Sequence, residues 1–256
     1  MADLSGLNPQ QRKAASTIEG PVLILAGAGT GKTRTLTHRV GYMISRGISP
    51  ENILAVTFTN KAAREMQKRV LKLIPKRRSD DDGKPLKPTI CTFHSLCVRI
   101  LRRHIDKLGY KRNFVIYSES EQLGVVKKIL AAITGKDVKA DPRELHALLS
   151  RIKNAGPNRQ VFGDEDSLAM AETLRRRYDT ALKACNAVDF DDLLVLALRL
   201  FEEHPEALEQ CRARYRYVMV DEYQDTNAPQ FELVRALAGE HRNVCVVGDD
   251  DQSIYG

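Results

Sequence analysis

The sequence contains no tryptophan, and only 6% of its 256 residues are aromatic. Its five cysteines form no C-x-x-C pair and its six histidines complete no metal-binding spacing, which argues against a zinc finger or a disulfide framework. An odd number of scattered thiols is typical of a reducing compartment. There is neither a signal peptide nor an apolar run of membrane-spanning length, so we expect a soluble, cytoplasmic protein with no membrane partner.

Neither positive nor negative charge dominates the sequence. The chain has 40 Lys and Arg against 33 Asp and Glu, a formal net charge of +7. This modest excess favours a polyanionic partner without identifying one. A hydrophobic content of 43% is sufficient for a large core in one or two domains.

The most informative stretch is the glycine-rich segment AGAGTGKT at residues 26–33. It follows an apolar run at 22–25 and precedes helical spacing, an order that is typical of phosphate-binding loops. Lys32 would reach the β- and γ-phosphates of a nucleotide, and the Thr33 hydroxyl would hold Mg²⁺. Ala26 stands where the common pattern has its first glycine. The structural alternative is a glycine-rich turn that only begins a helix.

Further strands are predicted at 53–58, 89–93, 217–220 and 244–247, and helical patterns separate them. This alternation predicts an α/β fold, a parallel sheet with helices on both faces. Ligands of such sheets bind at the carboxyl ends of the strands. The polar clusters of the sequence follow predicted strands, at residues 26–33, 57–61, 92–95, 221–225 and 248–255.

The character of the chain changes between residues 111 and 188. One β-like run at 114–117 is followed by helical patterns, and no further strand is predicted there. We therefore expect a mainly helical inserted subdomain. The predicted limits are 1–110 and 189–256 for the two parts of the main domain and 111–188 for the insertion.

Several helix ends can be predicted from local residue types. Asn8 is a candidate N-cap with Pro9 at the first helical position, and Asn60 is a candidate N-cap for a helix that runs to about residue 74. Asp189 would cap a strongly apolar helix that Pro205 ends. The acidic cluster at the start of that helix suits a helix N-terminus for structural reasons alone.

Two acidic residues follow the strand at 217–220 directly. Asp221 would bind Mg²⁺ opposite Thr33, and Glu222 would orient and deprotonate the attacking water. Gln252, after the last predicted strand, is a candidate sensor of the γ-phosphate, with an ordinary turn residue as the alternative. Asp-Glu after a strand is weak evidence alone, but it gains specificity from the Gly-Lys-Thr sequence earlier in the chain.

Aromatic and polar residues at other strand ends suit nucleic acid. Phe58 and Tyr255 are candidates for stacking against bases, while Phe93 is expected in the core. Candidate phosphate and sugar contacts are Thr59, Asn60, Lys61, Thr92, His94 and Ser95. A basic helix face formed by Arg99, Arg102 and Arg103 is equally consistent with a solvated surface and with phosphate contacts.

Taken together, these motifs resemble the superfamily 1 DNA helicases of the UvrD/PcrA/Rep type, specifically their N-terminal half. The matching stretches, in the family's order, are LNPQQ (7–11), AGAGTGKT (26–33), TFTNKAA (57–63), TFHSL (92–96), DFDDL (189–193), VDEYQDTN (220–227) and VVGDDDQSIYG (246–256). In that family alanine is usual at the position of Ala26. The resemblance implies a RecA-like P-loop motor domain with a helical insertion. It also implies ATP- and Mg²⁺-dependent 3′-to-5′ movement on single-stranded DNA or at single-strand/duplex junctions, in DNA repair or replication.

The resemblance also assigns roles to individual positions. Gln11 would read the adenine edge, Arg34 would pack against the base, and Lys32, Glu222 and Gln252 would serve hydrolysis. The phosphates would be held by the loop residues Ala26, Gly27, Ala28, Gly29, Thr30, Gly31, Lys32 and Thr33. The DNA path would be lined by Phe58, Thr59, Asn60, Lys61, Thr92, His94 and Tyr255.

The family's second motor domain, with arginines that complete the ATP site, would follow residue 256. We therefore expect residues 1–256 to bind ATP–Mg²⁺ weakly, to hydrolyse it slowly and not to unwind DNA. Two other functions remain open: the ATPase half of a helicase–nuclease subunit, and a nucleotide-gated module that binds single-stranded DNA.

Overall fold

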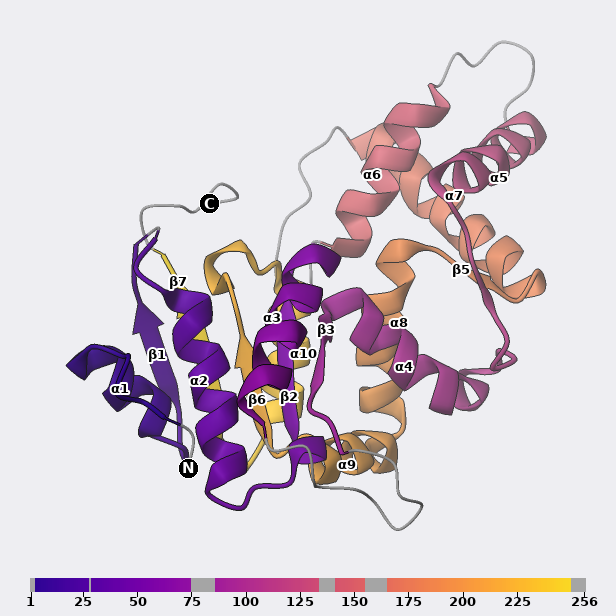
Figure 1. The fold of residues 1–256 in the computed structure, drawn as a ribbon. Coiled ribbons are helices and arrows are strands. Elements are labelled where there is room, and N and C mark those ends of the chain that lie inside the picture. Colours follow the sequence, from indigo (N-terminus) through magenta and orange to yellow (C-terminus); the bar gives the residue numbers. More distant parts are fainter. Residues whose placement is uncertain (1–2, 28, 75–85, 134–140, 155–164, 250–256) are drawn as a thin grey trace. The chain divides into compact units, whose positions relative to one another are not determined.

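The structure, a computed structural model, describes residues 3–27, 29–74, 86–133, 141–154 and 165–249 (Figure 1). The chain divides into two compact units. The first comprises residues 1–96, 206–226 and 234–256, and the second comprises residues 97–205 and 227–233. The predicted domain limits stay a prediction. No helix among the described residues is long and apolar enough to cross a membrane.

The first unit is built on a parallel sheet of five strands in the order β1-β7-β6-β2-β3. The strands are β1 (Val22–Leu25), β2 (Ile53–Thr57), β3 (Thr89–Thr92), β6 (Tyr217–Val220) and β7 (Val244–Gly248). The helices, with α4 and α10 shared between the units, are α1 (Pro9–Ser16), α2 (Lys32–Ser45), α3 (Asn60–Leu73), α4 (Phe93–His104), α9 (Pro205–Arg214) and α10 (Ala228–Ala238).

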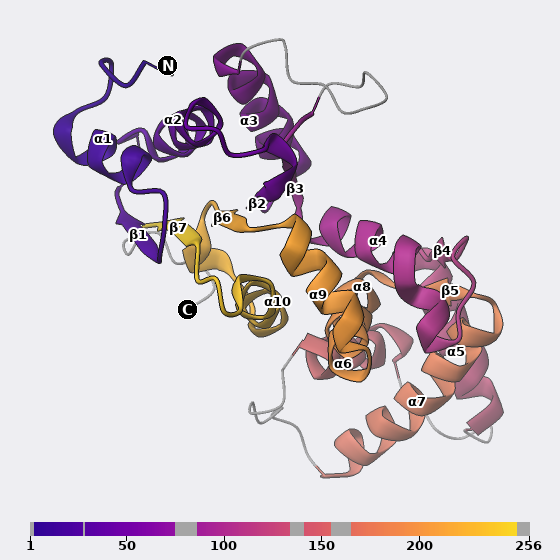
Figure 2. The same cartoon turned by 90° about the horizontal axis from the view of Figure 1, so that it is seen from below.

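Helices cover both faces of this sheet, as predicted. Helices α2 and α3 lie on one face, and α9 and residues 234–238 of α10 lie on the other (Figure 2). The side chains buried between α2, α3 and the sheet include Leu36, Met43, Ile53, Met66, Met219 and Val247. All five residues of β2 are buried, as expected of an inner strand covered on both faces. The α/β fold class with a parallel sheet is therefore confirmed.

The second unit is mainly helical. Its elements are α5 (Glu119–Ile133), α6 (Pro142–Asn154), α7 (Glu165–Ala184), α8 (Phe190–Glu203) and the short strands β4 (Val115–Ile116) and β5 (Ala187–Val188), together with the greater part of α4. Leu130, Leu149, Leu174 and Tyr178 are buried in its core. The expectation of no second strand between 111 and 188 was wrong, because β5 pairs in parallel with β4. A two-residue strand is too short to give a periodic pattern.

Most predicted helix ends are confirmed. Asn8 caps α1 through a capping box with Gln11, and Asp189 caps α8, which ends before Pro205. The prediction of Asn60 as a cap was wrong by one residue: the Thr59 hydroxyl accepts a hydrogen bond from Ala62 N at 3.1 Å, and Asn60 is the first helical residue. Thr and Asn are both good N-caps, so residue type alone does not choose between neighbours.

Candidate nucleotide site

The phosphate loop joins β1 to α2 at the carboxyl edge of the sheet. Gly29 and Gly31 have positive φ angles, 74° and 88°, which L side chains rarely adopt. Gly31 is the N-cap of α2 and supplies no side-chain cap, so the N–H groups of the first turn can serve an anion. The loop is braced by Thr30, whose hydroxyl donates to Gly27 O at 2.6 Å. Ala28 lies outside the described residues.

Lys32 is the first residue of α2 and is only 8% exposed. Its ammonium lies 3.3 Å from Glu222 Oε2 and 3.4 Å from Asp249 Oδ2. A buried ammonium requires negative partners, and here they come from the ends of β6 and β7. The ends of three neighbouring strands, β1, β7 and β6, therefore meet at one positive charge. The phosphates of a bound nucleotide would pair with the same ammonium group.

Thr33 and Asp221 face each other across the same site. Thr33 Oγ1 donates to Asp221 Oδ2 at 3.3 Å. The second carboxylate oxygen, Oδ1, is buried and has no hydrogen-bond partner among the described residues. Burial, and then the neighbouring charge of Glu222, raise the pKa of Asp221 to about 6. A hydroxyl beside an oxygen that lacks a partner suits Mg²⁺, which prefers oxygen ligands.

Glu222 has a left-handed backbone, with φ 54° and ψ 48°. This conformation is uncommon outside glycine and costs roughly 1–3 kcal/mol. Its side chain is 39% exposed, and its carboxylate accepts a hydrogen bond from Gln224 Nε2 at 2.8 Å. The carboxylate that would activate water is therefore accessible and is held at a fixed angle by a strained turn.

Sequence reasoning missed Gln224 and Asp249. Gln224 Oε1 accepts from Asp249 N at 3.1 Å, so one amide joins the segment after β6 to the end of β7. A Cβ on Gly248 would lie 3.0 Å from Gln224 Oε1, so glycine permits this approach. Both residues belong to polar clusters that follow predicted strands, so the sequence does mark their positions. It does not predict that they bond to each other, because that requires β6 and β7 to be neighbours in the sheet. Gln252 lies outside the described residues.

A pocket of about 540 Å³ adjoins the loop. It is lined by residues from α1, β1, the phosphate loop and α2, among them Asn8, Gln11, Leu23, Leu25 and Lys32. Gln11 Nε2 donates to Thr30 O at 2.8 Å, so α1 is attached directly to the loop. The Arg34 guanidinium donates to Gly6 O at 2.9 Å. An apolar wall with a nearby amide is suited to a planar base.

We expect the Asp221→Asn substitution to stabilise the protein in the absence of Mg²⁺. A pKa raised from 3.8 to about 6 means that the ionised carboxylate costs stability, about 3 kcal/mol when fully charged. The cost is absent below pH 3.8, grows as the pH rises to 6 and is complete above that pH. In chemical denaturation from pH 4 to pH 8, the free energy of unfolding of Asp221→Asn should rise relative to that of the parent protein. A difference between the two free energies that stays constant with pH would contradict the assignment.

Candidate DNA contacts lie at the ends of β2 and β3. Phe58 is half-buried, and its ring packs edge-on against Phe93, with centroids 5.6 Å apart at 67°. Phe93 is 1% exposed, which confirms its predicted place in the core. Tyr255 lies outside the described residues.

The polar candidates differ in exposure. Thr59, Asn60 and Lys61 are exposed at the start of α3, and His94 is half-buried. Thr92 is buried, and its hydroxyl donates to Ser95 Oγ at 2.9 Å. Thr92 is therefore already engaged within the turn that begins α4.

The basic face of α4 takes part in packing within the second unit. Arg99, Arg102 and Arg103 are all exposed. The Arg102 guanidinium carbon lies 3.9 Å from the centroid of the Phe114 ring, and one of its nitrogens donates to Arg112 O at 2.6 Å. Arg102 therefore anchors the segment that leads into β4 through a cation–π contact.

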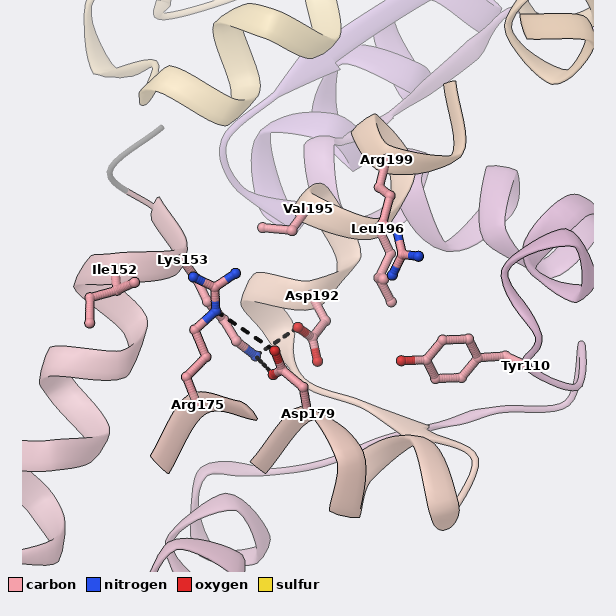
Figure 3. A pocket seen from close by; sticks show the side chains of 9 residues that line it. All are labelled: Tyr110, Ile152, Lys153, Arg175, Asp179, Asp192, Val195, Leu196 and Arg199. Carbon is pink, nitrogen blue, oxygen red and sulfur yellow. Dashed lines mark hydrogen bonds and ion pairs between the residues drawn. The ribbon is translucent and has the colours of Figure 1, made fainter. Parts of the chain in front are cut away.

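The acidic cluster at the start of α8 surrounds a buried lysine in the second unit. Lys153 Nζ lies 2.7 Å from Asp192, 2.8 Å from Asp189 and 3.5 Å from Asp179. Burial opposes its charge, but these carboxylates outweigh burial and raise the pKa of Lys153. Figure 3 shows Lys153 reaching from α6 toward carboxylates on α7 and α8. The DFDDL motif therefore has a structural role in joining three helices.

The Lys153 cluster borders a pocket of about 330 Å³ that also contains Tyr110 and the guanidinium groups of Arg175 and Arg199 (Figure 3). Arg199 is paired with Glu203 at 2.6 Å, and Arg175 lies 3.7 Å from Asp179. Burial raises the pKa of Tyr110 to about 12, so its hydroxyl stays protonated. Because acids and bases around this pocket largely balance, we assign it no ligand.

We expect Lys153→Met to destabilise the second unit by about 3–5 kcal/mol, since it leaves buried carboxylates facing one another without a cation. Thermal unfolding followed by circular dichroism measures this loss. The exposed Lys127 on α5 offers a matched control, and Lys127→Met should leave the free energy of unfolding within about 0.5 kcal/mol of the parent value. Equal effects of the two substitutions would show that the cluster is not structural.

A family model described as the UvrD/REP helicase N-terminal domain matches residues 7–256. The chain is 44% identical to the ATP-dependent DNA helicase PcrA of Staphylococcus aureus strain Mu50, over 99% of this chain and 34% of that protein. The PcrA of Staphylococcus epidermidis strain ATCC 35984 is 43% identical over the same shares. The chain thus spans about a third of the length of the curated relatives it matches.

Proposed function

Because the chain belongs to the family of UvrD/REP helicase N-terminal domains, we propose that it is the ATP- and single-stranded-DNA-binding part of a DNA helicase motor. The observation that carries this proposal is the meeting of two distant motifs. Lys32 pairs with Glu222, and Thr33 is hydrogen-bonded to Asp221. Residues of these types at these distances match the needs of phosphoryl transfer to water.

Each residue has a distinct role in hydrolysis. Lys32 and the N–H groups at the start of α2 would hold the β- and γ-phosphates. Thr33 and Asp221 would hold Mg²⁺, which neutralises phosphate charge when bound. Glu222 would orient the attacking water and accept its proton, and Gln252 would contact the γ-phosphate.

Adenine recognition is assigned to Gln11. Its Oε1 accepts from Asn8 N and its Nε2 donates to Thr30 O, and each atom retains a second hydrogen-bonding position. An amide oxygen and an N–H side by side match the donor N6 and acceptor N7 of adenine, whereas guanine presents two acceptors there. Arg34, in the first turn of α2, would pack against the base.

Single-stranded DNA would pass the carboxyl ends of β2 and β3, where Phe58 stacks on a base and the exposed start of α3 contacts phosphates. The direction of movement would be 3′ to 5′, as the family resemblance implies. In the cell we place this motor in the cytoplasm, in DNA repair or replication. A helicase–nuclease subunit and a nucleotide-gated DNA-binding module remain the alternative functions.

The isolated residues 1–256 would bind ATP–Mg²⁺ weakly and hydrolyse it slowly. In the proposed motor, arginines from a second motor domain complete the site and are worth about 10³–10⁵ in rate. The curated relatives are about three times as long as this chain, which leaves room for such a domain. Lys32, Thr33, Asp221 and Glu222 would then form one wall of the complete site.

We expect Phe58→Ala to weaken binding of an oligothymidine strand by about 5- to 150-fold, because a stacked base is worth roughly 1–3 kcal/mol. Fluorescence anisotropy over a salt series, with and without a non-hydrolysable ATP analogue, measures this effect. Phe231 on α10, 44% exposed, provides a matched aromatic control, and Phe231→Ala should leave DNA affinity unchanged.

The same titrations separate the candidate functions. In a motor, the analogue changes DNA affinity, and Lys32→Ala removes that change. If Lys32→Ala abolishes ATP binding but leaves the affinity for DNA unchanged, the DNA-binding module is favoured. Absence of single-stranded DNA binding at low salt would overturn the DNA assignment.

A further inference from the structure

We propose that Arg39 is a positioning residue for recognition of the nucleotide base: from within α2 it holds α1, and thereby Gln11, against the phosphate loop. This inference rests on the proposed function, in which Gln11 contacts adenine. Arg39 lies in the middle of α2, nearly two turns beyond the end of the loop, and belongs to none of the motifs identified above.

Arg39 is unusually placed for an arginine. It is 2% exposed and is among the largest fully buried side chains of the chain. Among the described residues it forms no ion pair. Its guanidinium instead donates to Ala14 O at 2.7 Å, to Ile18 O at 3.0 Å and to Thr17 O. Burying a charge is costly, and these three bonds offset part of that cost, while Nε is buried with no hydrogen-bond partner among the described residues.

The three carbonyls lie at and just beyond the C-terminus of α1. This end of a helix carries carbonyls without intrahelical partners and a partial negative charge, and a buried cation satisfies both. Helix α1 has only eight residues and buries only Ala15, so apolar packing by the helix itself contributes little to its attachment. We infer that hydrogen bonds from α2 add to the attachment that Leu7 and Ile18, on either side of the helix, provide by apolar packing.

Two arginines of α2 hold α1 from opposite sides of Gln11. Arg34 donates to Gly6 O before the helix, and Arg39 donates to carbonyls at and just beyond its C-terminal end. Between them, Gln11 approaches the loop so closely that a Cβ on Gly31 would lie 3.0 Å from its Nε2. Loosening the C-terminal end would let α1 pivot about Arg34 and move the Gln11 amide away from the base.

This geometry separates base recognition from phosphate binding. The carboxylates paired with Lys32 lie at the strand ends, and Thr33 and Asp221 are bonded to each other, so none of these bonds comes from α1. Helix α1 contacts the loop through the bond from Gln11 to Thr30 O. A change at Arg39 should therefore weaken adenine selectivity while leaving affinity for the phosphates alone nearly intact. A purely structural role would weaken both equally.

The test is an equilibrium titration of residues 1–256 with fluorescent ATP and GTP and with competing inorganic tripolyphosphate, all with Mg²⁺. For Arg39→Met we expect ATP affinity to fall about tenfold, tripolyphosphate affinity to change by less than about twofold, and the preference for ATP over GTP to fall toward one. Arg39→Lys should restore part of the preference, because an ammonium can still donate to one or two carbonyls.

Arg69 provides the matched control. It is an exposed arginine on α3 that pairs with Glu65, and Arg69→Met should leave all three affinities unchanged. If Arg39→Met does not fold, a double-mutant cycle with Arg39→Lys and Gln11→Ala tests whether Arg39 acts through Gln11. The effect of Arg39→Lys on the ATP-to-GTP ratio should vanish in the Gln11→Ala background.

Three results would overturn the inference: equal losses of ATP and tripolyphosphate affinity, an unchanged ATP-to-GTP ratio in the Arg39 variants, or an undiminished Arg39→Lys effect when Gln11 is absent. A parent protein that binds tripolyphosphate without preferring ATP would also overturn it, and would leave the phosphate site standing. A parent protein that binds neither would overturn the proposed function itself.

Discussion

Replacing Lys32 with alanine is expected to weaken ATP binding by more than about 100-fold. Lys32 is the only cation among the described residues that is paired with the carboxylates of Glu222 and Asp249. Without Lys32, the carboxylates of Glu222 and Asp249 would lose this cation and would repel the negative phosphates. Breaking a buried charge pair costs about 3–5 kcal/mol, and 3 kcal/mol already corresponds to more than 100-fold in affinity.

Equilibrium titration with a fluorescent ATP analogue in the presence of Mg²⁺ measures the Lys32 effect. Circular dichroism on the same sample distinguishes loss of binding from loss of fold. Lys68, an exposed lysine on α3, offers a matched control, and Lys68→Ala should bind ATP like the parent protein. ATP affinity within about twofold of the parent value in Lys32→Ala would contradict the assignment.

Replacing Glu222 with glutamine is expected to slow ATP hydrolysis by about 10²–10⁴-fold while ATP binding is retained. The amide keeps the shape of the side chain and can accept from Gln224, but it cannot take a proton from water. ATP affinity should stay equal or rise, because one negative charge is removed 3.3 Å from Lys32. Loss of rate without loss of binding is the mark of an interaction used only in the transition state.

Single-turnover hydrolysis of labelled ATP, with a parallel binding titration, measures both effects of Glu222→Gln. The exposed Glu65 on α3 supplies the control, since Glu65→Gln removes the same charge far from the strand ends. An unchanged rate in Glu222→Gln would show that another group activates the water. A loss of affinity matching the loss of rate would show that Glu222 acts in binding.

These two predictions depend on the backbone as much as on the side chains. Asp221 continues β6 and points at Thr33, and the left-handed turn at Glu222 then redirects the next carboxylate toward Lys32. Two adjacent acids therefore serve two different partners. Burial, followed by the charge of Glu222, also raises the pKa of Asp225, so the acids of this turn repel one another when no cation is present.

Features encoded in a short stretch could be predicted from the sequence. The phosphate loop depends on glycines with positive φ followed by Lys32 and Thr33, and the capping of α1 depends on Asn8 and Gln11 three residues apart. The gathering of polar clusters at one edge followed from strand alternation alone, because parallel strands all end on the same side.

Features that depend on neighbours distant in sequence were not predicted. The bridge from Gln224 to Asp249 requires β6 to lie beside β7, and the burial of Lys153 requires α6 to meet the start of α8. Arg39 was missed for a similar reason: its partners are backbone carbonyls, which every residue possesses. Residue types cannot identify an interaction of this kind.

Steady-state ATP hydrolysis by residues 1–256, with and without single-stranded DNA, tests most directly whether this chain forms one wall of the ATP site. Typical enzymes turn over about 10 times per second, and arginines supplied by a second domain are worth about 10³–10⁵ in rate. We predict turnover of about 10⁻² s⁻¹ or less, with little stimulation by DNA. Robust, DNA-stimulated turnover, abolished by Glu222→Gln, would contradict this and show a complete site.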